Sequence, residues 1–112
     1  MGVTKSELFT DSQNRMAIWS KVLAHPARIA IIEQLISTNS CVNSQLVLDL
    51  GLAQATISQH LRELKSIGII KGNIEGASVN YCIDATVWNE IKTSFQDFFD
   101  RYPSDFCNDK NC

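Results

Sequence analysis

The sequence lacks any apolar run long enough to cross a membrane, and its first residues, MGVTKSELF, contain no apolar signal-peptide region. It also lacks the patterns of common enzyme sites, because no phosphate loop, paired-carboxylate motif or nucleophile-base arrangement is present. These absences predict a cytoplasmic protein that is not an enzyme. With 112 residues, 45% of them apolar, the chain suits one domain with a single core. We expect that domain at 1–102 and a flexible tail at 103–112.

Basic residues are few, and the formal net charge of −2 argues against a generally basic nucleic-acid binder. The charges are unevenly distributed, however. Residues 21–72 hold five basic and three acidic side chains, whereas residues 84–112 hold three basic and six acidic ones. The acidity therefore lies in the C-terminal third, and the middle of the chain is mildly basic.

No C-x-x-C pair occurs among the four cysteines, Cys41, Cys82, Cys107 and Cys112. A disulfide framework is not expected in a cytoplasmic chain with this much core, so we predict free thiols. Two uses of these thiols stay open. They could bind a soft ion or undergo redox chemistry, or they could be small packing residues, which is the interpretation favoured for Cys82.

The stretch Asp49–Ile70 has the outline of a helix-turn-helix, with a turn at Gly51 and a second helix over Gln54–Ser66. Three apolar residues of this second helix form one stripe: Ile57, Leu61 and Leu64. The side chains on the remaining surface are amide, hydroxyl or cationic groups that suit a major-groove reader. We predict these DNA contacts, together with Arg28 and Lys71 outside the helix: Gln54, Thr56, Ser58, Gln59, His60, Arg62 and Lys65.

The run GLAQATISQHLRELKSIGIIK resembles the recognition region of the ArsR family of winged helix-turn-helix repressors. KVLAHPARIAIIEQL is similar to the family's second helix, and SVNYCID to its second wing strand. The sequence departs from the family pattern at Ala53, where a Ser or Thr that could cap the helix is usual. The resemblance implies a DNA-binding transcriptional repressor that forms a homodimer on double-stranded operator DNA.

The whole chain therefore predicts a mainly α fold with a small β-hairpin, built from five helices and a two-stranded wing. The first four helices are expected at Ser6–Leu23, Pro26–Ser37, Ser44–Leu50 and Gln54–Ser66, with His25 capping the second. The wing strands are expected at Ile69–Ile74 and Ser78–Asp84. The wing tip, Glu75 to Ser78, is poor in Arg and Lys, and a strong contact with the DNA backbone is not indicated there.

The last helix, over Thr86–Tyr102, carries aromatic side chains at the spacing of a helix-pairing seam. So much aromatic surface on a terminal helix indicates a two-fold dimer. In the ArsR family the first and last helices form that interface. We predict these interface residues: Trp19, Trp88, Ile91, Phe95, Phe98 and Tyr102. The alternative is a last helix packed wholly within its own subunit.

ArsR relatives that sense arsenic, cadmium or lead often carry C-V-C at the start of the supporting helix, where this chain has Cys41-Val42-Asn43. As(III) and similar soft ions favour about three thiolates, so Cys41 alone is no site. Cys107 and Cys112 would have to complete it. The family's other metal site, on the last helix, is not supported because that helix contains no histidine.

Two functions from different classes remain open. The first is a repressor whose DNA affinity an effector lowers, with As(III), another soft metal ion or an oxidant as candidate effectors. The second is a protein-interaction or dimerisation module that kept the scaffold and lost DNA reading, as the weak wing and the acidic balance suggest.

Overall fold

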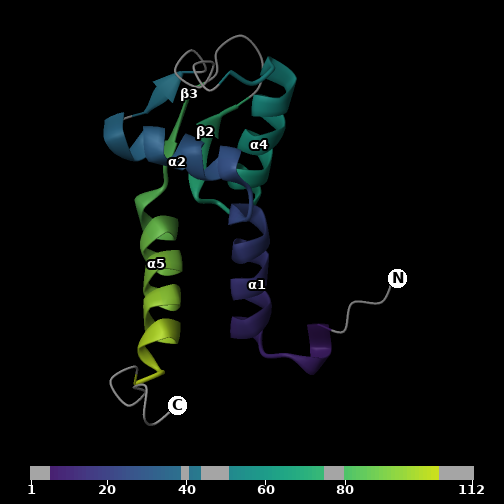
Figure 1. The fold of residues 1–112 in the computed structure, drawn as a ribbon, viewed down its shortest axis with the longest axis vertical. Coiled ribbons are helices and arrows are strands. Elements are labelled where there is room, and N and C mark those ends of the chain that lie inside the picture. Colours follow the sequence, from purple (N-terminus) through teal and green to yellow (C-terminus); the bar gives the residue numbers. More distant parts are fainter. Residues whose placement is uncertain (1–5, 39–40, 44–50, 75–79, 104–112) are drawn as a thin grey trace, which may run out of the picture.

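Four α-helices and a small three-stranded sheet make up the part of the chain that the structure, a computed structural model, describes: residues 6–38, 41–43, 51–74 and 80–103. The elements, in chain order, are η1 (Ser6–Leu8, a 3-10 turn), α1 (Asp11–Leu23), α2 (Pro26–Thr38), β1 (Val42–Asn43), α4 (Gln54–Ser66), β2 (Ile70–Asn73), β3 (Asn80–Ile83) and α5 (Ala85–Asp100). Figure 1 shows α1 and α5 running side by side, with α2, α4 and the sheet gathered at one end of the pair.

The mainly helical fold with an antiparallel hairpin is confirmed, but the described residues hold four of the five predicted α-helices. The expected supporting helix, Ser44 to Leu50, lies outside the described residues. So do the predicted wing tip, Glu75 to Ser78, and all of the predicted tail at 103–112 except its first residue.

Local hydrogen bonds set where the helices begin. Thr10 and Gln13 form a capping box, in which Thr10 Oγ1 accepts from Gln13 N at 3.0 Å and Gln13 Oε1 accepts from Thr10 N at 2.9 Å. This cap explains why the predicted first helix is divided into η1 and α1. His25 Nδ1 accepts from Ala27 N at 3.1 Å, which confirms the predicted cap of α2. At α4, Ala53 makes no side-chain cap bond, as its methyl group requires.

The sheet has the order β1-β3-β2 and is antiparallel throughout. The sequence predicted only the hairpin of β2 and β3. The third strand, β1, has just two residues, and its pairing partner lies far along the chain. Gly72 of β2 has φ +120°, and a Cβ there would collide with the backbone oxygen of Asn80 on the facing strand.

A single apolar core joins the helices to the sheet. Its buried members are Trp19, Val22, Ile31, Ile32, Leu35, Ile57, Leu61, Leu64, Ile69, Ile70, Ile74, Tyr81 and Ile91. Between α1 and α5, the rings of Trp19 and Phe95 lie 6.3 Å apart, and Arg15 pairs with Glu90 at 3.7 Å. Over the described residues, no helix is both long and apolar enough to span a bilayer.

Candidate nucleic-acid interface

The two sides of α4 differ sharply. Ile57, Leu61 and Leu64 are 1%, 2% and 0% exposed, which confirms the predicted apolar stripe and fixes the helix against the core. The opposite side faces outward. Its exposed polar residues are Gln54, Thr56, Gln59, Arg62 and Lys65, while Ser58 is half-buried. Of the seven predicted DNA contacts on α4, five are therefore exposed, one is half-buried and one, His60, is buried.

Hydrogen bonds orient Gln59 on this surface. Arg62 Nη2 donates to Gln59 Oε1 at 3.3 Å, and Gln59 Nε2 donates to Glu63 Oε1 at 3.4 Å. Each of these bonds uses one lone pair or one N–H of the amide, so Gln59 can still offer a second acceptor site and a second N–H at the exposed surface. A base edge that offers an acceptor and a donor, such as that of adenine, can pair with such a group.

Lys65 connects the end of α4 to the wing. Its Nζ donates to the backbone oxygen of Gly72 at 2.7 Å. The neighbouring strand residue Lys71 is exposed. Arg62, Lys65 and Asn73 also line an open cavity of about 420 Å³ between α4 and β2. The two cations of α4, Arg62 and Lys65, therefore lie beside β2, whereas Lys71 lines a different cavity, between α2 and α5.

His60 and Arg28 occupy different surroundings from those predicted. His60 is 6% exposed, its Nδ1 accepts from Arg28 Nε at 3.1 Å, and its ring lies 4.4 Å from that of His25. Arg28 also donates from Nη1 to the backbone oxygen of Val22 at 2.9 Å. His60 therefore has little surface with which to contact DNA, because its ring is buried in the protein. Arg28 is half-buried and acts here as a tie between α1, α2 and α4.

The surroundings of His60 disfavour its charged form. Burial, followed by the charges of His25 and Arg28, lowers the pKa of His60 below its ordinary value of 6.5. The neutral ring accepts at Nδ1 and so carries its proton on Nε2. Nothing in the sequence spacing indicated this cluster, because Arg28 and His60 are 32 residues apart and meet only after α2 packs on α4.

The predicted dimer residues fall into two groups. Trp19 and Ile91 are each 6% exposed, so both belong to the core of their own subunit and leave little surface for a second subunit to cover. Trp88 and Phe95 are half-buried against that core. Phe98 and Tyr102 are 46% and 61% exposed, and Phe99 beside them is 68% exposed. The outer end of α5 therefore carries an aromatic surface that its own subunit leaves open.

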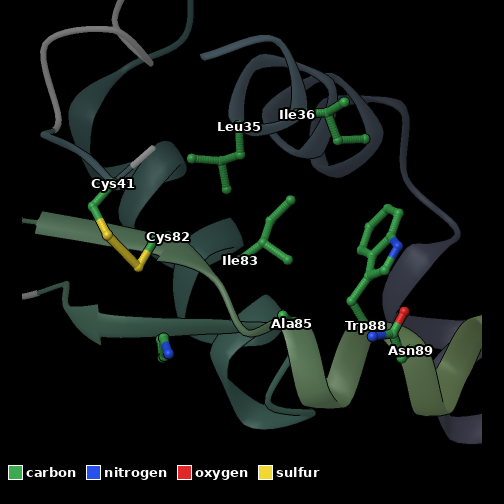
Figure 2. Close-up of a pocket in the computed structure, with 9 residues that line it drawn as sticks. Leu35, Ile36, Cys41, Cys82, Ile83, Ala85, Trp88 and Asn89 are labelled. Carbon is green, nitrogen blue, oxygen red and sulfur yellow. A yellow bond between two sulfur atoms is a disulfide. The ribbon is translucent and has the colours of Figure 1, made fainter. Parts of the chain in front are cut away.

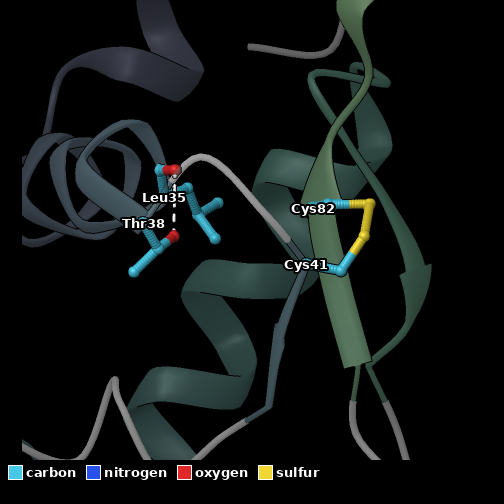
Figure 3. The surroundings of a disulfide bond; sticks show 4 residues. All are labelled: Leu35, Thr38, Cys41 and Cys82. Carbon is cyan, nitrogen blue, oxygen red and sulfur yellow. Dashed lines mark hydrogen bonds between the residues drawn. A yellow bond between two sulfur atoms is a disulfide. The ribbon is translucent and has the colours of Figure 1, made fainter.

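The prediction of free thiols at Cys41 and Cys82 is wrong, because these residues form a disulfide (Figure 3). The physical reason is the unpredicted strand β1. Val42 pairs with Tyr81 and Asn43 with Asn80, which places the preceding residue, Cys41, opposite Cys82. The two Cα atoms are 4.2 Å apart. A bonded Cys41 offers no thiolate to a metal ion.

The residues expected to complete a metal site, Cys107 and Cys112, lie outside the described residues. Within 6–38, 41–43, 51–74 and 80–103, no three His, Cys, Asp or Glu side chains are grouped closely enough to hold a metal ion. The His, Cys, Asp and Glu side chains of the described residues therefore do not fit a soft-metal site of about three thiolates.

Comparison with known proteins agrees with this geometry. Residues 25–71, which include α2, α4 and the start of β2, match the family described as "Bacterial regulatory protein, arsR family". This match confirms the resemblance noted in the sequence. The matched residues include α4 and its polar surface.

Two relatives come from Mycobacterium tuberculosis (strain ATCC 25618 / H37Rv). The uncharacterized HTH-type transcriptional regulator Rv0081 is 38% identical over 65 residues, which are 58% of this chain and 57% of the relative. The HTH-type transcriptional repressor SmtB is 43% identical over 61 residues, or 54% of this chain and 44% of the relative. The matches thus span about half the length of these relatives. Both are named as regulators, in agreement with the prediction that the chain is not an enzyme.

The fold resembles a solved structure over most of its length. The crystal structure of M. tuberculosis Rv0081 superposes with a TM-score of 0.60 at 29% identity, covering 87% of this chain and 97% of that one. The likeness therefore extends well beyond residues 25–71, to the helices and strands that flank the arsR-family domain.

Proposed function

We propose that the chain is a transcriptional repressor that binds double-stranded operator DNA as a homodimer. The observation that carries this proposal is the exposed surface of α4, where Gln54, Thr56, Gln59 and Arg62 face outward while the opposite stripe is held in the core. Such a helix can enter the major groove and present amide, hydroxyl and guanidinium groups to base edges. The names of the relatives support the same function.

We expect three exposed cations per subunit to contact phosphates: Arg62, Lys65 and Lys71. A dimer that uses all six would show a slope of log K against log salt of about −5. Arg28 is left out of this estimate because it is hydrogen-bonded to His60. A slope near zero would favour the alternative, in which the domain is an interaction module that does not bind DNA.

Base reading is tested by Gln59→Ala, with Gln96→Ala as a matched control, because Gln96 is an exposed glutamine of α5. Fluorescence anisotropy would measure affinity for DNA taken from just upstream of the protein's own reading frame, and for random DNA. We expect Gln59→Ala to cost about 1–3 kcal/mol on the upstream DNA and much less on random DNA. Equal losses on both DNAs, or an equal loss for Gln96→Ala, would count against Gln59 as a base reader.

An effector that lowers DNA affinity is part of the proposal. Thiolate binding of As(III) or another soft ion first requires reduction of the Cys41–Cys82 bond. The complex of the protein with operator DNA can be titrated with arsenite before and after reduction of the protein. This titration tests whether release of DNA by arsenite requires free thiols. Release of DNA only after reduction would support a thiolate effector site, and no release in either state would oppose it.

A further inference from the structure

A cavity of about 560 Å³ lies beside the sheet, between α2 and the start of α5. Figure 2 shows Leu35 and Ile36 of α2 reaching towards Ile83 and Trp88, with the disulfide at the other end of the cavity. The volume falls within the range of small-molecule sites, about 300–1,000 Å³. Its walls are chiefly apolar, and the Cys41–Cys82 disulfide forms one end of the cavity.

The two bonded cysteine residues differ in exposure. Cys41 is exposed, whereas Cys82 is half-buried in the central strand β3. A thiol that enters the cavity therefore reaches Cys41 Sγ more readily. Attack on one sulfur of a disulfide expels the other as a thiolate, and the reaction is faster when that leaving thiolate is stabilised.

The lysine Lys71 lies opposite Cys82, the residue that would become the leaving thiolate. Lys71 of β2 pairs with Cys82 of β3 in the antiparallel register, and both residues line the cavity. Directly opposed residues project from the same side of a sheet, with their Cβ atoms about 5 Å apart. The Lys71 side chain is thus long enough to bring its ammonium near Cys82 Sγ, where it would stabilise a negative charge.

We infer that this cavity is a reaction site for a small apolar thiol, which binds between α2 and α5 and opens the Cys41–Cys82 disulfide. This inference concerns a covalent reaction of the chain and does not depend on DNA binding. The thiol attacks as its thiolate. A bond forms between its sulfur and Cys41 Sγ, the Sγ–Sγ bond breaks, and the electron pair leaves on Cys82 Sγ beside Lys71. A second thiol then displaces Cys41 from the mixed disulfide, so that two thiols are oxidised to one disulfide and the protein gains two thiols.

The test uses the full-length oxidised chain carrying Cys107→Ser and Cys112→Ser, so that only the bonded pair can react. The protein is treated briefly with benzyl mercaptan, quenched in acid, and alkylated to mark the freed thiol. Peptide mapping by mass spectrometry then locates the benzyl group and the alkyl label. We expect the benzyl group on Cys41 and the label on Cys82. A benzyl group found mainly on Cys82, or equally on both, would overturn the inference.

Two matched pairs of variants test the site itself. Ile36→Glu places a negative charge at the cavity and should slow the reaction about fivefold, whereas Ile29→Glu changes an equally exposed isoleucine of α2 that does not line the cavity. Lys71→Gln should also slow the reaction about fivefold, whereas Lys21→Gln, at an exposed lysine of α1 that does not line the cavity, should leave it unchanged. These rates are measured on folded protein, verified by circular dichroism.

The preference for an apolar thiol is measured against 2-mercaptoethanol at equal thiolate concentration. We expect benzyl mercaptan to react several-fold faster, because its ring can occupy the cavity next to Trp88. The inference fails if the two thiols react alike, if either variant pair shows no difference, or if the purified oxidised chain contains no Cys41–Cys82 bond.

Discussion

Replacing Phe98 by alanine should weaken the association of two subunits much more than the folding of a single subunit. Phe98 is 46% exposed in the single subunit, near the outer end of α5. A phenylalanine side chain has about 200 Å² of surface, so roughly 90 Å² remains for a second subunit to cover. At about 25 cal/mol per Å², covering it contributes about 2 kcal/mol per copy, and about 4–5 kcal/mol in a symmetric dimer. The Kd of the dimer should rise roughly a thousandfold.

Phe95→Ala is the matched control, because Phe95 lies one helical turn earlier and packs against Trp19 within its own subunit. That change should cost about 3 kcal/mol of folding free energy. Sedimentation over a range of concentrations gives the Kd, and urea unfolding below that concentration gives the stability of the single subunit. If Phe98→Ala leaves the Kd unchanged, or if the wild type is a stable monomer at micromolar concentration, the proposed α5 interface is wrong.

Three further outcomes follow from the core and the sheet. The folded state lowers the pKa of His60, so below pH 6.5 the unfolded chain binds more protons than the folded chain. The folding stability that depends on a neutral His60 is therefore complete above pH 6.5 and is lost as the pH falls through the folded-state pKa. Urea unfolding between pH 7.5 and 5.5 should show this loss, and His60→Gln, which keeps a polar partner for Arg28, should reduce it. Leu64→Ala should cost about 3 kcal/mol in thermal unfolding, because Leu64 is 0% exposed, whereas Leu8→Ala at a 69% exposed position should cost under about 0.5 kcal/mol. Gly72→Ala should destabilise the chain by roughly 1–3 kcal/mol in the same assay, since φ is +120° and the facing strand blocks a Cβ, and a wild-type melting curve would contradict that strain.

The sequence predicted the elements whose signals are local. The bounds of α4 were predicted as Gln54–Ser66 and observed as such, because the apolar period of that helix is strong and Gly51 marks its preceding turn. The positive φ expected at Gly51 is present, at +76°. These features depend only on neighbours within a few residues.

The features that the sequence did not predict depend on distant pairing. Strand β1 is too short to show an alternating pattern, and it exists only because β3 supplies its hydrogen-bonding partner. The disulfide was missed for the same reason. Burial of His60 was missed because a polar residue beside the apolar stripe of an amphipathic helix looks like a surface residue until a partner such as Arg28 is known.

The disulfide gives the oxidised chain a covalent ring. Its ends are 41 residues apart in the sequence, and the ring encloses all of α4 and β2. Closing a loop of this size disfavours the unfolded chain by about 4 kcal/mol in the chain-entropy description. A protease that cuts once between 44 and 50 would therefore leave α4 joined, through the disulfide, to the part of the chain that precedes the cut. On a denaturing gel such a nicked chain should migrate as one species without reductant and as two fragments with it.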